Sequence, residues 1–162
     1  MRSVKDNITW CLKQKRGIKV EQPNDNLAKA FIKKAKSALN MLSAATEKDE
    51  IDWVATTAYY ARYFSLYGLL QKCGIKSEIH DCTVTLLKFI FVDEFVSEEL
   101  YQELQLAKQL RVDTQYYVAD ELDTMKLKKD ADTARQFVLK MEEVIDNLSP
   151  AQIEEIRKKI IL

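Results

Sequence analysis

Arg62 stands out among the residues that could carry chemistry, because the sequence around it is almost entirely apolar or aromatic. Between Asp52 and Gln71 lie eighteen residues, and Arg62 is the one formal charge among them. A guanidinium in such surroundings must pair with a carboxylate, stack on an aromatic ring or open to a cleft. The sequence therefore predicts either a buried ion pair, packed among Tyr59, Tyr63 and a carboxylate from another helix, or a ligand-binding residue.

The single histidine, His80, lies beside Asp81 and Cys82, but these residues do not have the spacing of a metal site. Three consecutive side chains on a helix point in different directions, and no second cluster supplies further ligands. The position of Cys82 near a helix start could lower the pKa of its thiol, but the same geometry disfavours a Cys–His nucleophilic pair. We therefore expect no metal, and we keep His80 as a candidate ligand-binding residue. The alternative is a local hydrogen-bonding or surface role.

Several familiar catalytic signatures are missing from the sequence. It has no Gly-rich phosphate loop, no Walker motif and no Gly-x-Ser-x-Gly elbow. These absences disfavour the common classes of nucleotide hydrolase and esterase. We expect no cofactor.

The helix that must position Arg62 is the segment from Glu50 to Gly74, around which the rest of the chain is organised. Its apolar and aromatic residues point in every direction around a helical wheel, as in the central helix of a bundle. Its length would also allow a membrane span, but its four tyrosines and its arginine would each need an internal partner in lipid. We therefore expect a buried central helix that ends at Gly74, and no membrane span.

Apolar periodicity predicts the other helices. They are expected over residues 3–16, 25–45, 79–92 and 97–111, from 130 or 132 to about 145, and from 149 onward. Asp130 or Asp132 would cap the penultimate helix, and the last helix begins with a Ser cap, Pro at the first helical position and Gln152 two positions later. Between Arg111 and Met125 the periodicity weakens, so we expect an irregular helix end followed by a connection.

The composition fits an all-α fold. At 162 residues the chain suits one domain, over residues 1–162, that buries its own core, and its three glycines and two prolines are too few for the turns of an all-β fold. Residues 1–40 hold ten Lys and Arg against three Asp and Glu, a charge of +7. This charge can mark a face for phosphates or an acidic partner, or it can be a solvated helix surface.

The cysteine content predicts a reducing environment. The three cysteines are odd in number and have no paired-ligand spacing, so we expect no disulfide framework. The N-terminal residues contain no apolar segment of the kind found in secretory signals. The sequence therefore predicts a cytoplasmic protein.

A longer pattern links the central helix to the helix that follows it. The sequence reads Ala-Tyr-Tyr-Ala-Arg-Tyr-Phe at 58–64, Leu-Leu at 69–70, Gly-Ile-Lys-Ser at 74–77 and His at 80, before an apolar helix. This pattern resembles that of the HEPN domain family, whose name stands for higher eukaryotes and prokaryotes nucleotide-binding. Arg111, followed by two tyrosines, sits where that family has an arginine and an aromatic pair. The resemblance spans about residues 25–147.

The resemblance implies an up-and-down bundle of about five to seven helices that forms a homodimer. Catalytic HEPN proteins are metal-independent ribonucleases with an Arg-x4–6-His motif, which contributes an arginine and a histidine from each protomer. Here Arg111 is present, but the positions after the four-, five- and six-residue spacers are Tyr116, Tyr117 and Val118. A tyrosine, with a pKa near 10, is a poor general base at neutral pH, although it can donate a hydrogen bond to phosphate.

Two functional interpretations follow from this resemblance. The preferred one is a non-catalytic HEPN module that binds the phosphate of a nucleotide or RNA, or that docks a small nucleotidyltransferase in a toxin–antitoxin-like pair. The alternative is a metal-independent ribonuclease with a degenerate motif, in which Arg111 would be the catalytic residue. The candidate ligand-binding residues are Arg111, Asp113, Tyr116, Tyr117, Arg62 and His80.

Overall fold

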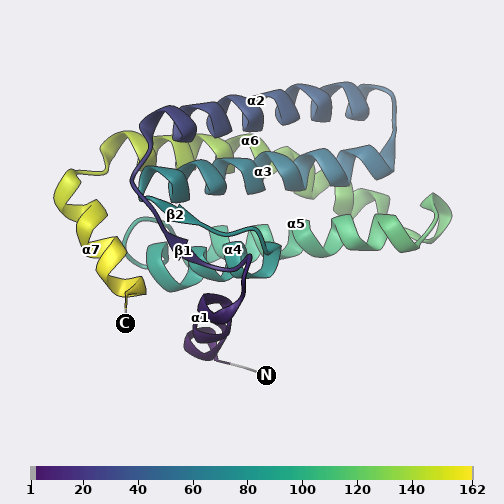
Figure 1. Cartoon of the computed structure of the whole chain (residues 1–162). Helices are drawn as coiled ribbons and strands as arrows, with labels where there is room; N and C mark the ends of the chain where they lie inside the picture. The colour runs from purple at the N-terminus through teal and green to yellow at the C-terminus, as the bar shows by residue number, and fades with distance from the viewer. Residues whose placement is uncertain (1–2, 162) are drawn as a thin grey trace.

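Long helices packed around α3 form the centre of the fold (Figure 1). The computed structural model describes residues 3–161, in which α2 (Asp25–Glu47) and α3 (Ile51–Lys72) form a hairpin. The helix α6 (Thr124–Asn147) packs against α3 and α2, and α5 (Glu98–Tyr116) packs against α3. The predicted all-α helical bundle with a central helix is therefore confirmed.

The close pairing of α2 and α3 depends on small residues. A row of buried alanines on α2, including Ala28 and Ala35, faces α3, where Ala58, Ala61 and Gly68 are buried. A Cβ atom on Gly68 would lie 3.1 Å from the Ala28 carbonyl oxygen, which is tighter than an ordinary contact. Small side chains let the two backbones approach, so this pair forms the most extensive packing in the fold.

The end of α3 follows the sequence prediction. Gly74 has a φ of +68°, a left-handed conformation that glycine adopts without steric cost. The short strands β1 (Lys19–Val20) and β2 (Ile75–Lys76) pair antiparallel. This pairing links the segment after α1 (Val4–Lys13) to the segment that follows the central helix α3. Such two-residue strands carry no periodic signal that a sequence could reveal.

A disulfide joins Cys11 of α1 to Cys82 of α4 (His80–Leu86), so the expectation of no disulfide was wrong for this pair. Their Cα atoms lie 5.8 Å apart, within the range that a disulfide can bridge. Cys73 is the free, buried third cysteine, and burial raises the pKa of its thiol to about 12. An odd cysteine count does not exclude a single pair. Only the approach of α1 to α4 identifies the partners.

The later helices differ from the prediction at their ends. The helix α5 continues through Arg111 to Tyr116, and the irregular connection is shortened to the residues around the 3₁₀ turn η2 (Ala119–Glu121). Asp123 caps α6 by accepting a hydrogen bond from the Lys126 amide, so neither Asp130 nor Asp132 is its cap. The sequence pattern did not show the end of α5 or the start of α6, because exposed helical turns need no apolar stripe.

Two remaining features complete the bundle. The apolar helix after His80 ends as a π-helical turn, η1 (Leu87–Phe91), rather than continuing to residue 92 as a regular helix. The final helix, α7 (Pro150–Ile160), has the predicted capping box between Ser149 and Gln152. Within residues 3–161, we find no helix with both the length and the apolar character that crossing a bilayer requires.

Candidate functional site

Arg62 lies inside the bundle and is held by carboxylates from two other helices. Its side chain is 0% exposed, its Nε donates to Glu103 Oε1 at 2.8 Å and its Nη1 donates to Asp130 Oδ2 at 3.2 Å. Its Nη2 also donates to the Asp130 carbonyl oxygen, at 2.6 Å. Burial raises the pKa of the Asp130 carboxyl, and the charge of Arg62 opposes that rise. Of the two alternatives for Arg62, the structure shows the buried ion pair, and it leaves no surface of Arg62 for a ligand.

A second cluster brings His80 and Arg111 together over three tyrosines of α3. The His80 ring stacks on Tyr63 with 4.2 Å between centroids, and its Nδ1 lies 2.7 Å from Tyr59 Oη. The Arg111 Cζ atom lies 5.1 Å from the Tyr59 ring centroid and 5.8 Å from that of Tyr60. We call Tyr59, Tyr60, Tyr63, His80 and Arg111 the Tyr–His–Arg cluster.

Three elements position this cluster. Tyr59 and Tyr63 are four residues apart on α3, so they lie on the same helical face, and Tyr60 borders it. His80 is the first residue of α4, directly after the short segment that β2 anchors to β1. Arg111 lies one turn after Ala107, which is buried in α5. The buried stripe of α5 therefore brings Arg111 to the edge of the face that contacts α3.

A hydrogen bond joins His80 to the buried Tyr59. Burial, followed by the charge of Tyr63 when ionised, raises the pKa of Tyr59, so its hydroxyl stays protonated at neutral pH. Among the described residues, His80 Nδ1 is the only hydrogen-bond partner of Tyr59 Oη, and the tautomer of the ring sets which of the two atoms donates. Burial first, and then the charges of Arg111 and Lys108, lower the pKa of His80. In the tautomer that accepts at Nδ1, the neutral ring carries its proton on Nε2, and in the other tautomer Nε2 is a hydrogen-bond acceptor.

Arg111 has no carboxylate partner among residues 3–161. Its Nη1 lies 3.5 Å from Tyr60 Oη, and its Nε is buried without a hydrogen-bond partner among the described residues. Nearby, Lys108 pairs with Asp81, and burial followed by the charge of Arg111 lowers the pKa of Lys108. The guanidinium is thus held by aromatic rings and keeps its capacity to bind an anion.

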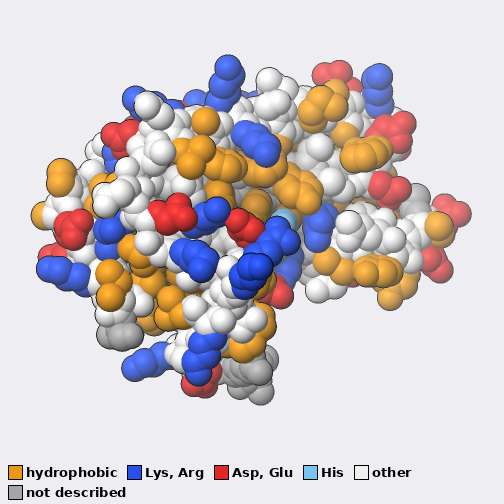
Figure 2. Space-filling view, viewed as in Figure 1, with side chains coloured by type: hydrophobic (Ala, Val, Ile, Leu, Met, Phe, Trp, Pro, Cys, Tyr) orange, Lys and Arg blue, Asp and Glu red, His pale blue; other side chains and the backbone are white. Residues whose placement is uncertain are grey.

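The surface of the cluster is accessible. Figure 2 shows the pale blue histidine atoms bordered by Lys and Arg side chains and by hydrophobic side chains. His80, Tyr60 and Arg111 are each partly exposed, whereas Tyr59 is fully buried. A ligand can therefore reach the outer edge of the cluster while its floor stays fixed by packing.

The structure does not bring Asp113, Tyr116 and Tyr117 to Arg111. Asp113 accepts a hydrogen bond from Gln109 at 2.8 Å, and Tyr116 is 78% exposed at the end of α5. Asp113 and Tyr117 line a separate hollow of about 240 Å³ between the end of α5 and the start of α6. Asp113 and Tyr116 follow Arg111 on a regular helix, so the helical turn sets the directions of their side chains, and Tyr117 is the extended residue that ends this helix.

Sequence reasoning did not single out Tyr59, Tyr60, Tyr63 and Lys108 as candidate site residues. The tyrosines were present in the pattern at 58–64, but their place in a site depends on which face of α3 meets α4 and α5. Lys108 belongs to no motif. It precedes Arg111 by three residues, however, and this spacing places the two cations on one helical face.

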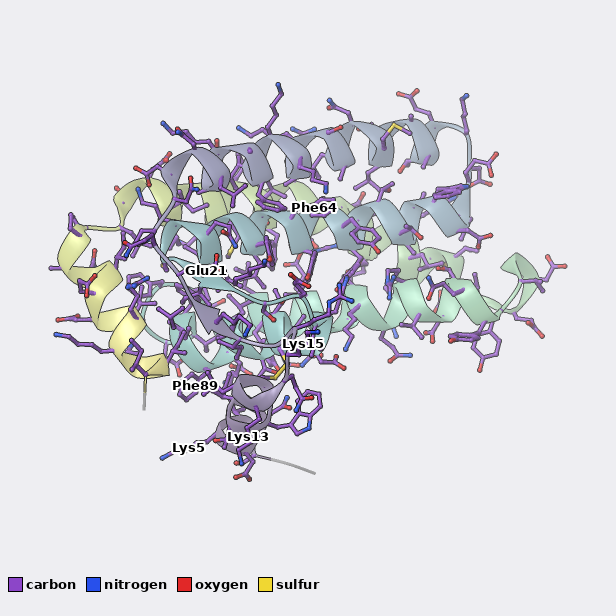
Figure 3. The ribbon with its side chains drawn as sticks, in the orientation of Figure 1. Lys5, Lys13, Lys15, Glu21, Phe64 and Phe89 are labelled. Atoms are coloured by element: carbon purple, nitrogen blue, oxygen red, sulfur yellow. A yellow bond between two sulfur atoms is a disulfide. The ribbon has the colours of Figure 1, made fainter. Side chains whose placement is uncertain are left out.

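Aromatic rings continue from the cluster across the boundary between α3 and α2. Tyr60 stacks on Phe64 with 5.4 Å between centroids, and Phe64 lies 6.4 Å from Phe31. The Lys34 Nζ atom lies 4.3 Å from the Phe64 ring centroid. We call Tyr60, Phe64 and Phe31 the aromatic strip. Figure 3 shows Phe64 between α2 and α3, and Figure 2 shows hydrophobic side chains along the same boundary.

The described residues offer no obvious metal site. Within residues 3–161, no group of three or more His, Cys, Asp or Glu side chains is placed to hold a metal ion. The chemistry available at the cluster is therefore that of a guanidinium, an imidazole and phenol hydroxyls.

Comparison with known families agrees with the sequence pattern. The model of the HEPN domain family matches residues 28–151, which is most of the chain. No curated protein matches the sequence. The matched range includes every residue of the Tyr–His–Arg cluster and of the aromatic strip.

Proposed function

The chain belongs to the HEPN domain family, and from this we propose that it is a non-catalytic member that binds the phosphate of a nucleotide or RNA at its Tyr–His–Arg cluster. Membership indicates a role connected with nucleotides or RNA in general. The observation that supports this site is Arg111, which is held over Tyr59 and Tyr60 with no carboxylate partner among the described residues.

The donors of the cluster suit a phosphate. A guanidinium donates to phosphate oxygens in a paired geometry, and such charge-assisted hydrogen bonds are stronger than neutral ones. His80 adds an imidazole to the cluster, and Lys108, which pairs with Asp81, adds a second positive charge at its edge. Burial is the main cause that lowers the pKa of both side chains, and the positive charge of Arg111 lowers it further; an anionic ligand would neutralise that charge.

The aromatic strip suits the bases of the same ligand. Bases stack on aromatic side chains with little sequence preference, and a nearby cation binds the backbone phosphates. Tyr60 and Phe64 are partly exposed, and Lys34 lies over Phe64. A nucleotide whose phosphate contacts Arg111 would therefore have a ring surface beside it, and a short RNA could extend along the strip.

One observation supports a binding role rather than catalysis. The positions after Arg111 carry tyrosine, tyrosine and valine in place of the family's catalytic histidine. One observation favours the alternative ribonuclease: His80 shares a cluster with Arg111 although it comes from a different helix.

We also propose that the protein forms a homodimer and that a small nucleotidyltransferase is its partner in the cell. The family resemblance supports both proposals. The apolar run after His80 gives the dimer little support. Its residues Leu87, Ile90 and Phe91 are buried within the chain's own core and so are not available to an interface. Exposed apolar side chains lie elsewhere, including Met41 and Trp53 beside a hollow of about 310 Å³.

The test of phosphate binding is a calorimetric titration of AMP, ATP and a short RNA into the wild type and Arg111→Ala. Loss of one charged hydrogen-bond partner should weaken binding at least tenfold, and Arg111→Lys should restore part of it as a point charge. Arg135→Ala is the matched control, because Arg135 is an exposed arginine of α6, distant in sequence from the cluster.

A metal-free RNA cleavage assay separates the two candidate functions. Binding that depends on Arg111 without cleavage supports the non-catalytic module. Cleavage that Arg111→Ala or His80→Ala abolishes would establish the ribonuclease instead. Equal binding by the wild type and Arg111→Ala would remove the cluster as the site.

A further inference from the structure

A cavity of about 280 Å³ lies where α1, η1 and α7 meet, and no residue of the Tyr–His–Arg cluster lines it. Its apolar lining comes from all three elements: Ile8 and Leu12 of α1, Phe89 of η1 and Ile160 of α7. The remaining lining residues are three lysines and a threonine. We infer that this cavity binds a small amphipathic anion, with a short apolar body and a carboxylate or phosphate head.

The apolar lining is only partly covered by the protein. Ile8 and Ile160 are buried, at 3% and 2% exposure, and they form the floor. Leu12 is 38% exposed and Phe89 is partly exposed, so the walls retain apolar surface in contact with water. An apolar group inserted between them would remove this surface from water, which is the main source of affinity in such pockets.

The lysines give the cavity its preference for an anion. Lys5 and Lys13 are eight residues apart on α1, with Thr9 midway, so the three side chains lie on one helical face. Figure 3 shows Lys5 and Lys13 on α1, with Phe89 on the side of α1 that faces the rest of the molecule.

Only one of these cations is compensated. Lys159 pairs with Glu94, whereas Lys5 and Lys13 form no ion pair with any residue that the structure describes. Two uncompensated charges beside an apolar wall are complementary to a ligand that carries a negative head on an apolar body.

The cavity is held in place without a ligand. Cys11, on the same helix as the lysines, is bonded to Cys82 of α4, and Asn7 Nδ2 donates to Thr85 Oγ1 at 2.9 Å. These links fix α1 against α4, which continues directly into η1 and Phe89. Ligand pockets are usually preformed and span roughly 300–1,000 Å³, so a cavity just below this range suits a single medium-length chain and not a bulky ligand.

The test is a calorimetric titration with octanoate, octyl phosphate and octanol, each as a monomer in solution. Both anions should bind, and the neutral octanol should bind at least tenfold more weakly. The double substitution Lys5→Gln with Lys13→Gln should reduce the affinity for both anions at least tenfold. The matched control removes the same charge from α2 through Lys29→Gln with Lys33→Gln, and it should bind as the wild type does.

A second readout locates the ligand. Methyl NMR signals of Ile8, Leu12 and Ile160 should shift on addition of octanoate, and Arg111→Ala should bind octanoate normally because its site is separate. Equal affinity for octanol and octanoate, or equal losses in the two double variants, would overturn the inference. Binding to phosphatidylglycerol vesicles without binding of monomeric octyl phosphate would also overturn it, in favour of a membrane surface.

Discussion

The guanidinium of Arg111 lies 5.1 Å from the centroid of the Tyr59 ring, and the hydroxyl of the same tyrosine bonds His80 at 2.7 Å. One buried side chain of α3 therefore positions the two residues of the chain that are best suited to contact phosphate. Because Tyr59 is 0% exposed, this arrangement depends on the packing of the bundle and not on a flexible loop.

We predict that Phe64→Ala weakens the binding of a short RNA and leaves AMP binding nearly unchanged. Stacking of one base on an aromatic ring contributes about 1–3 kcal/mol, and Phe64 lies one ring beyond Tyr60 on the aromatic strip. Calorimetry with AMP and a tetranucleotide measures both effects. Phe95→Ala, which removes a ring outside the strip, is the control, and equal losses for the two ligands would contradict the extended strip.

We predict that His80 makes the protein less stable as the pH falls below about 6.5. The folded pKa of His80 lies below its ordinary value of 6.5, so the unfolded state binds the proton more readily in this window. The stabilisation that neutral His80 gives the folded state is complete above the pKa of His80 in the unfolded state. It declines as the pH falls toward the pKa of His80 in the folded state. Urea unfolding at several pH values should show a smaller decline for His80→Gln. Identical pH profiles would show that the ring is not desolvated.

We predict that Arg62→Ala reduces the free energy of unfolding by about 3–5 kcal/mol, because it leaves the buried Asp130 carboxylate without its cationic partner. Asp130→Asn in the same background should recover part of this loss by removing the unpaired charge. Urea denaturation measures both. The exposed Arg135→Ala should change stability by no more than about 0.5 kcal/mol, and a similarly small effect of Arg62→Ala would mean that the pair is not buried in solution.

We predict that Cys11→Ser costs about 2–4 kcal/mol under oxidising conditions, because the bond closes a loop with a sequence separation of 71 residues. Under reducing conditions the difference from wild type should shrink to the effect of the side chain alone. Thermal unfolding with and without reductant provides the comparison. Cys73→Ala should remain sensitive to reductant, and a wild type that does not respond to reductant would show that the bond is absent.

We predict a dimer in solution, on the basis of the family resemblance. Light scattering at micromolar concentrations should give about twice the chain mass of 18.8 kDa. Charge reversal at the exposed Lys33 should leave the mass unchanged if the dimer forms through apolar surface. Trp53→Glu places a charge on the exposed apolar surface beside α2, and it tests whether the dimer forms through that surface. A mass equal to one chain over this range would contradict the prediction.

Local patterns in the sequence were enough to determine the helical character of the fold and the family. The all-round apolar segment at 50–74 predicted the central helix, Gly74 predicted its end and the Ser149 capping box predicted the last helix. Each of these signals lies within a few neighbouring residues, where helix periodicity and capping act. Periodicity was weaker evidence between Arg111 and Met125, where exposed helical turns lack an apolar stripe.

Only the tertiary structure decided which distant residues meet. The sequence predicted that Arg62 could pair with a carboxylate, but Asp130 and Glu103 were selected by the packing of α6 and α5 against α3. The packing of α4 against α5 placed His80, not Tyr116 or Tyr117, beside Arg111, and the packing of α1 against α4 brought Cys11 to Cys82. Such contacts depend on the angle and axial offset between helices, which the summed packing of many side chains sets and no single motif encodes.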